Sequence, residues 1–210
     1  EAIVAEVAQV FDDAVGRGSQ NYLLRRDAVD AATQAIEPLV DAHFGVEASE
    51  RLLIDDTVNV IIPSIQPSRS RPSGPTMLAV SDQALQDYAA RLCDTLGQWA
   101  RPGEDISGKV TRSTNLGLAM AVVERVNGRH NRAPAAPDTS DVLATIAKLQ
   151  KALPGTRRTL DFVRGMKIFD GPHLYVIKPD TRRFWTESAA LNDADEIAGT
   201  LLTISARAHS

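Results

Sequence analysis

The chain has 210 residues, of which 43% are apolar and 24% charged, and its formal net charge is −4. This composition predicts a globular protein with a core, and it excludes a chain that is basic over its whole surface. No apolar run is long enough to span a membrane, so no membrane contact is expected. The single cysteine, Cys93, excludes an internal disulfide framework and favours the reducing cytoplasm. Because the first residue is Glu1 rather than methionine, we expect a piece of a longer chain.

Residues 1–44 have the pattern of helices. In residues 1–18 the apolar side chains recur at three-to-four spacing and form a stripe of Ile3, Val4, Val7, Val10 and Phe11. The same spacing returns in residues 22–44, where Pro38 is expected to kink the helix or split it in two. The sequence therefore predicts an N-terminal helical part.

The segment after these helices changes in composition. Residues 57–62, TVNVII, are mostly β-branched and predict a strand that ends at Pro63. The stretch PSRSRPSGP follows, so residues 64–80 predict a loop, and a boundary within the chain would fall there. A single domain over residues 1–210 is the alternative, and the sequence leaves both open.

The middle of the chain predicts a helix, two strands and another helix. Ser81 is a good N-cap for a helix that ends before Pro102. Two strands follow, joined around residues 113–115, and the second is almost continuously apolar, as in a central strand. A basic loop, NGRHNRAPAAPD, then leads to a helix capped by Thr139 or Ser140.

The last part of the chain predicts a hairpin and a final helix. Residues 160–169 and 173–177 have the composition of two strands around an Asp170-Gly171 turn. Asn192 or Asp193 is expected to cap the last helix, which carries acids in its first turn. The complete order is α, α, β, α, ββ, α, ββ, α. It predicts an α+β fold with a mostly antiparallel sheet and helices packed on it.

No stretch matches a catalytic signature. The histidines lack the spacing of a metal-binding pair, and no glycine loop has phosphate-binding spacing, so we expect neither a metal site nor a cofactor. The pair Asp55-Asp56 stands at the start of the predicted strand, where a metal-dependent nuclease places ligands, but no lysine follows at the required spacing. The sequence favours a chain without catalytic activity, and a divergent nuclease that uses Asp55 and Asp56 is an alternative.

The cations give a further functional signal. Most acids lie on predicted helices, whereas a set of cations lies in predicted loops or at element ends: Arg69, Arg71, Arg129, Arg132, Arg157, Arg158, Lys178, Arg182 and Arg183. If these loops share one side of the sheet, the acidic protein has a local basic face that contacts phosphates. Solvated loops in which arginines are common are the alternative.

The segment RRFW, residues 182–185, bears directly on this choice. Its arginines adjoin Phe184 and Trp185, a combination that stacks on a base and pairs with a phosphate or a carboxylate. Alternation along the chain favours burial of one aromatic side chain and exposure of the other, as at an interface. The alternative is that Trp185 packs into the core while the arginines pair with acids of the last helix.

The run LYVIKPDTRRFWTESAALNDADEIAGTLL resembles segments of proteins from bacterial, particularly actinobacterial, DNA modification and phage-defence loci. The resemblance covers the last part of the chain and implies a DNA-linked context. The leading hypothesis is a non-catalytic module that binds DNA or a DNA-bound partner through Arg69, Arg71, Arg129, Arg132, Lys178, Arg182, Arg183 and Trp185. The second hypothesis is a protein-interaction or oligomerisation subunit that presents the same RRFW surface to an acidic partner.

Overall fold

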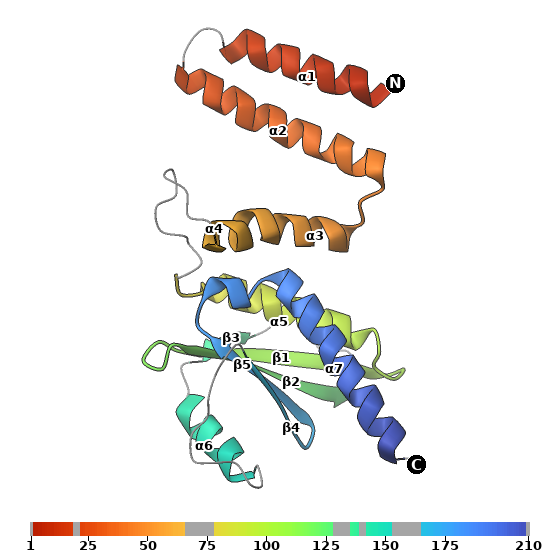
Figure 1. The fold of residues 1–210 in the computed structure, drawn as a ribbon. Helices are drawn as coiled ribbons and strands as arrows, with labels where there is room; N and C mark the ends of the chain where they lie inside the picture. The colour runs from red at the N-terminus through yellow and green to blue at the C-terminus, as the bar shows by residue number, and fades with distance from the viewer. Residues whose placement is uncertain are drawn as a thin grey trace. The chain divides into compact units, whose positions relative to one another are not determined.

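The computed structural model describes residues 2–18, 22–65, 78–127, 135–138, 142–152 and 165–208. The chain forms two compact units, Glu1–Ile54 and Asp55–Ser210, which we call the N-terminal unit and the α/β unit. Figure 1 shows the elements of each unit. Among the described residues, no helix combines the length and the apolar composition that are needed to cross a membrane.

The N-terminal unit is helical, as predicted. It contains α1 (Ala2–Gly18), α2 (Tyr22–Phe44) and the greater part of α3 (Ala48–Asp56). α1 and α2 run antiparallel and pack against each other as a helical hairpin (Figure 1). Of the two outcomes expected at Pro38, a kink or a split, the split is excluded, because α2 continues through this exposed residue. Gly45, with φ 65°, follows α2 in a left-handed conformation that glycine adopts without strain.

The predicted strand at residues 57–62 is also wrong. Thr57–Ile61 form a π-helical turn, η1, and a short helix, α4 (Ile62–Ile65), follows it. Val60 and Pro63 are buried, so burial follows the three-residue spacing of a helix rather than the alternation of a strand. The β-branched composition misled the prediction, because packing readily overrides β propensity.

The α/β unit is built on one sheet. Its central strands are antiparallel, in the spatial order β1 (Glu104–Ser113), β2 (Leu118–Asn127), β5 (His173–Pro179) and β4 (Met166–Asp170). A short strand, β3 (Ala135–Asp138), pairs in parallel with β1 at the edge of the sheet, in a segment predicted as a loop. The predicted α+β fold with a mostly antiparallel sheet is confirmed.

Both predicted hairpins are present. Gly117, with φ 61°, lies in the turn between β1 and β2, and Gly171, with φ 59°, lies in the turn between β4 and β5. The register places Ala121 of β2 between Val110 of β1 and Val176 of β5. All three side chains are fully buried on one face of the sheet. The register therefore aligns the core residues of neighbouring strands on the same face.

Helices cover both faces of this sheet. α5 (Asp82–Gly97) and α7 (Glu187–Ala208) pack on one face (Figure 1), around a core that includes Leu85, Tyr88, Leu92, Trp185 and Ile197. α6 (Val142–Ala152) contributes to a second core on the other face, where Ile146 and Leu149 pack with Met120, Tyr175 and Ile177. The predicted caps of α6, Thr139 and Ser140, lie outside the described residues.

One close contact fixes the position of α5 on the sheet. Cys93 is buried, and its Sγ lies 2.6 Å from where a Cβ at Gly108 of β1 would be. This distance is too short for any side chain, so glycine permits the helix to approach the strand. The thiol therefore packs between α5 and β1.

The other two helix caps predicted in this unit have different outcomes. Ser81 caps α5 as predicted, because its hydroxyl accepts a hydrogen bond from the backbone N–H of Ala84 at 3.2 Å. The prediction for α7 is wrong, since this helix begins at Glu187 and Asn192 and Asp193 lie inside it. The hydroxyl of Thr186 accepts the capping hydrogen bond from the N–H of Ala189 at 3.2 Å. Asp193 is therefore available for contacts with the sheet.

Candidate functional site

The residues predicted to form a basic face fall into three groups. Arg69, Arg71, Arg129, Arg132, Arg157 and Arg158 lie outside the described residues. Lys178 and Trp185 are buried in the α/β unit, with 7% and 1% of their surface exposed. Arg182 and Arg183 are exposed in η2 (Arg182–Phe184), the 3-10 turn between β5 and α7. The structure thus separates the predicted surface cations into exposed and buried ones.

Lys178 lies at the centre of a buried polar cluster. Its ammonium donates a hydrogen bond to the carboxylate of Asp193 and another, of 3.1 Å, to the backbone carbonyl of Phe184. The same ammonium lies 4.7 Å from the ring centroid of Tyr88 and 5.6 Å from that of Trp185. We therefore correct the interpretation of Lys178 as a surface cation, because its charge is directed into the core.

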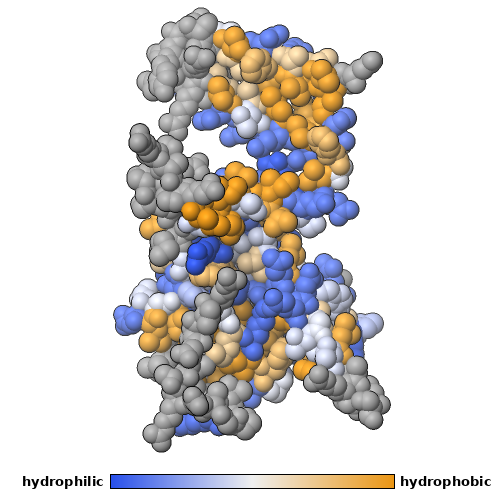
Figure 2. Space-filling view, in the orientation of Figure 1, coloured by the Kyte–Doolittle hydropathy of each residue, from blue (hydrophilic) through white to orange (hydrophobic). Residues whose placement is uncertain are grey.

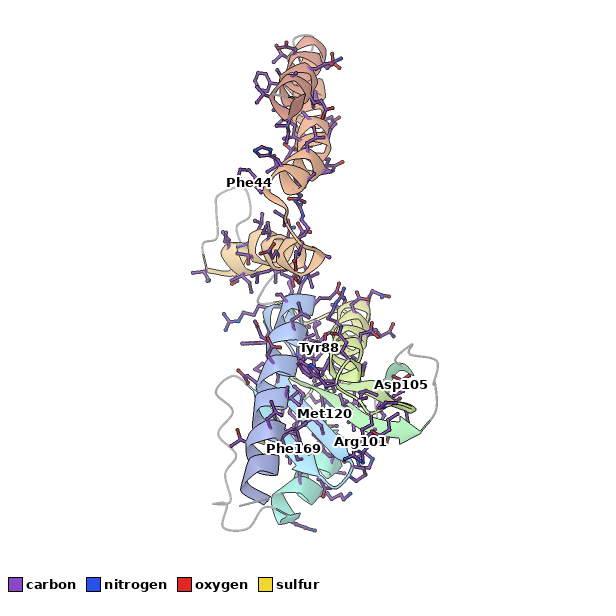
Figure 3. The ribbon with its side chains drawn as sticks, turned by 90° about the vertical axis from the view of Figure 1, so that its right-hand side faces the viewer. Phe44, Tyr88, Arg101, Asp105, Met120 and Phe169 are labelled. Atoms are coloured by element: carbon purple, nitrogen blue, oxygen red, sulfur yellow. The ribbon has the colours of Figure 1, made fainter. Side chains whose placement is uncertain are left out.

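Asp193 connects the last helix to the sheet and to α5 through this cluster. Its Oδ2 accepts a hydrogen bond of 2.5 Å from the hydroxyl of Tyr88. Its Oδ1 lies 2.8 Å from Nζ of Lys167 on β4. Figure 3 shows Tyr88 in the space between α5 and α7. Four elements, α5, α7, β4 and β5, therefore each contribute a polar side chain to one cluster.

Burial and charge act in opposite directions on these groups. Burial favours a raised pKa for Asp193, but the charge of Lys178 and three hydrogen bonds outweigh it and hold the pKa below its ordinary value. Burial lowers the pKa of Lys178, and the attraction of Asp193 offsets this in part. Burial, together with the charge of Asp193, raises the pKa of Tyr88 well above its ordinary value. Asp193 is therefore an anion at neutral pH, and Tyr88 is a neutral donor to it.

Trp185 packs into the core and does not face solvent. Its indole N–H donates a hydrogen bond of 2.8 Å to the carbonyl of Pro179, and its ring meets that of Tyr88 edge to face, with centroids 4.8 Å apart. Phe184 is partly buried, and the guanidinium of Arg183 lies 4.6 Å from its ring centroid. We therefore correct the interpretation of Trp185 as an interface residue. Its side chain anchors the turn between β5 and α7.

Arg182 and Arg183 form no ion pair with any residue that the structure describes. Three acids of α7 are paired with other cations: Glu187 with Arg91 at 2.7 Å, Asp193 with Lys167 and Lys178, and Glu196 with Lys167. The predicted pairing of these two arginines with acids of the last helix is thus not found in the described part of the chain. Their guanidiniums face solvent, where an external anion can pair with them.

The acid pair Asp55-Asp56 does not begin a strand. Both residues end α3, and the carboxylate of Asp56 accepts a hydrogen bond of 2.8 Å from the backbone N–H of Ser188, in the first turn of α7. Within the described ranges, no three His, Cys, Asp or Glu side chains are grouped as metal ligands. Asp56 has a structural contact, and the nuclease alternative gains no support from these residues.

The sequence prediction missed an apolar surface in the N-terminal unit. Six large side chains on α1 and α2 have between 38% and 75% of their surface exposed: Val4, Phe11, Val15, Val29, Val40 and Phe44. We call these six residues the hairpin face. Figure 2 shows apolar residues gathered over α1 and α2, and Figure 3 shows Phe44 at the C-terminal end of α2. Exposed apolar surface of this kind is typical of an interaction site.

Each helix of the hairpin carries two apolar stripes. The first stripe is half-buried or buried and lies against the other helix. The second stripe belongs to the hairpin face, and most of its residues directly follow a residue of the first stripe in the sequence. The successive pairs are Ile3-Val4, Val10-Phe11, Ala14-Val15, Ala28-Val29 and Leu39-Val40. One residue corresponds to about 100° around a helix. The sequence prediction merged both stripes of α1 into one, although the adjacent apolar pairs were the visible signal.

The exposed stripes of the two helices lie on the same side of the hairpin. In both helices the exposed stripe is turned in the same sense, by about 100°, from the stripe that contacts the other helix. α1 and α2 are antiparallel, so a two-fold axis perpendicular to the plane of the pair relates them. Rotation about this axis exchanges the helices, and a stripe on the front of one helix is moved to the front of the other. The six residues therefore lie on one side of the hairpin, where the exposed Thr33 stands between Val29 and Val40.

The acids of the hairpin lie outside this face. The N-terminal unit has ten acids and four Lys or Arg residues, which gives a formal net charge of −6. Helical spacing places the acids of α1 and α2 beside or opposite the hairpin face. Arg51 of α3 pairs with Glu37 at 2.7 Å and with Asp41 at 3.0 Å, so two acids beside the face are neutralised within the unit.

Comparisons with protein-family models, with curated proteins and with solved structures find no match to this chain.

Proposed function

We propose that the chain is a non-catalytic protein-interaction module and that the hairpin face is its docking surface. One observation carries the proposal: two antiparallel helices present six large apolar side chains to solvent on one side, with Phe44 75% exposed. Protein interfaces have an apolar centre with a polar rim. The hairpin face has an apolar centre, and acids of α1 and α2 lie outside this centre.

The small core of the N-terminal unit supports this proposal. Ala28 is the one buried side chain among those described in the unit. Helices in proteins are stabilised mainly by packing of an apolar face, and the described side chains of this pair bury little apolar surface by themselves. A partner that covers the hairpin face supplies the missing packing.

Cysteine labelling of the complete chain tests the proposal. The native Cys93 is buried and reacts slowly, so an added cysteine gives the signal. Val15→Cys places a thiol on the hairpin face, and Gln9→Cys places one on the exposed opposite side of the same helix. In the assembled state we expect Val15→Cys to react roughly tenfold more slowly than Gln9→Cys, because the partner excludes the reagent.

The mass of the labelled species decides how protection is interpreted. Light scattering on the same samples shows whether a single chain or an assembly is being labelled. If Val15→Cys is protected in a species with the mass of one chain, the face is covered from within and the proposal is wrong. If it is protected in an assembly and as reactive as Gln9→Cys in a single chain, the proposal is supported.

A second candidate function is contact with nucleic acid through Arg182 and Arg183. The specific observation is that both guanidiniums are exposed and pair with no described acid, whereas Arg51, Arg91 and Arg112 are paired. The resemblance of the surrounding run to proteins of DNA modification and phage-defence loci agrees with this candidate. Phosphate contacts by arginines make affinity strongly dependent on salt.

Fluorescence anisotropy with labelled single- and double-stranded DNA tests this candidate. We expect binding that weakens as salt rises and that falls at least tenfold when Arg182→Glu and Arg183→Glu are combined, because two phosphate contacts become repulsive. The control combines Arg101→Glu and Arg125→Glu, which make the same charge change at other exposed arginines. Equal losses in both double variants, or no binding at low salt, exclude this pair as a specific DNA contact.

A further inference from the structure

We infer that the hairpin face binds the hairpin face of a second copy, so that two chains form a four-helix bundle around a two-fold axis. The inference rests on the proposed function, because it names the partner of the same surface. The arrangement of the stripes, the placement of charge and the size of the face carry it.

The angle between the two stripes of each helix fits a four-helix bundle. In such a bundle each helix contacts two neighbours, which lie about 90° apart around it. In α1 and α2 the half-buried stripe and the hairpin face are about 100° apart. The half-buried stripe of each helix contacts the other helix of the hairpin, and the exposed stripe is left for a helix outside it. Since the exposed stripes of α1 and α2 lie on the same side, a second pair of helices is needed to cover them.

A second copy supplies such a pair with matching chemistry. An isologous interface brings the same patch of both subunits together, so an apolar patch meets an apolar patch. The hairpin face contains six apolar side chains, and the acids of both helices lie outside it. Two hairpins can therefore meet without placing carboxylates opposite each other at the centre of the contact.

The charge pattern leaves no acid at the centre of this face for a basic partner to contact. A basic helix gains affinity where acids border its binding site. Next to the hairpin face, Glu37 and Asp41 already pair with Arg51, at 2.7 and 3.0 Å. The remaining acids give the N-terminal unit its net charge of −6 but lie away from the centre of the face. Recognition at this face is therefore apolar, and added salt is not expected to weaken it.

The size of the face is close to the lower limit for a specific dimer interface. The 17 residues of α1 make a helix about 25 Å long, and two packed helices are roughly 20 Å wide. The projected face is thus on the order of 500 Å² per copy, and the accessible area of its side chains is larger than the projection. Stable interfaces bury about 800 Å² per partner. The hairpin face approaches this size.

The mass of the complete chain in solution tests the inference. Sedimentation or light scattering across a concentration series is expected to give twice the single-chain mass of 22.7 kDa. Phe11→Glu and Val40→Glu, each on the hairpin face, are expected to weaken the dimer at least about 100-fold, because each buries an unpaired carboxylate. Gln9→Glu and Gln34→Glu add the same charge at exposed positions of α1 and α2 outside the hairpin face and are expected to leave the dimer unchanged.

The outcomes separate this inference from the proposed function. All four variants are compared at equal helix content by circular dichroism, so that loss of folding is not counted as loss of association. A single-chain mass at every concentration up to about 100 μM overturns the dimer. If Val15→Cys is then as reactive as Gln9→Cys, the face is open to a different protein and the proposed function stands. If Val15→Cys is protected in the single chain, both the dimer and the proposed function are contradicted.

Discussion

Trp185→Ala is expected to lower the free energy of unfolding of the α/β unit by about 3–5 kcal/mol. The side chain is 1% exposed and lies among the largest buried residues of the core between α5, α7 and the sheet. Its removal leaves a cavity, and it also removes the donor to the carbonyl of Pro179. The measurement is denaturant unfolding followed by circular dichroism.

The control for this variant is Trp99→Ala, which removes the other tryptophan of the chain. Trp99 is 55% exposed, so its loss is expected to cost less than about 1 kcal/mol. Equal losses of unfolding free energy in the two variants would contradict the burial of Trp185 and would indicate that its side chain lies on the surface. A larger loss in Trp185→Ala places RRFW at the structural junction before α7 rather than at an aromatic interface.

Asp193→Ala is expected to cost about 3–5 kcal/mol of unfolding free energy. The substitution leaves the ammonium of Lys178 buried without its anion, and it also removes the acceptor of the Tyr88 hydroxyl. Asp195→Ala changes an exposed acid of the same helix and is expected to have little effect. If the combined variant Lys178→Met, Asp193→Leu recovers most of the loss, the unpaired charge is the cause.

The same comparison has a defined pH dependence. The pKa of Asp193 is held below its ordinary value in the folded chain, so its stabilising contribution is present above the pKa of the unfolded chain. This contribution is lost as the pH falls below about 4 and passes through the lower folded pKa. The difference in stability between the native chain and Asp193→Ala should therefore shrink in acid. A difference that is constant from neutral pH to strong acid would contradict the ionised pair.

Local signals predicted much of the α/β unit. The N-cap at Ser81 and the Asp170-Gly171 turn each specify a backbone conformation by short-range chemistry, so these elements were found where predicted. The segment 57–62 was misassigned because its β-branched residues suit a strand, while the burial of Val60 and Pro63 depends on packing. Contacts between distant segments decide such cases.

The interpretation of Lys178 as a surface cation was wrong for a related reason. Lys178 lies in a strand next to a polar segment, and nothing in its neighbourhood along the chain predicts Asp193 and Tyr88 as partners 15 and 90 residues away. The capping prediction also assigned Asp193 to a local role, although its partners come from other elements. By contrast, the two stripes of α1 were visible as adjacent apolar pairs. Treating all apolar positions as one stripe hid the exposed half.

Cysteine reactivity at Val15→Cys, measured across the concentration range in which the mass of the chain is also determined, tests the central claim most directly. The account predicts that labelling of this thiol slows as the mass doubles, while labelling of Gln9→Cys does not change with concentration. A Val15→Cys thiol that reacts as fast as the Gln9→Cys thiol in every assembled species would contradict the claim that the hairpin face is where this protein docks.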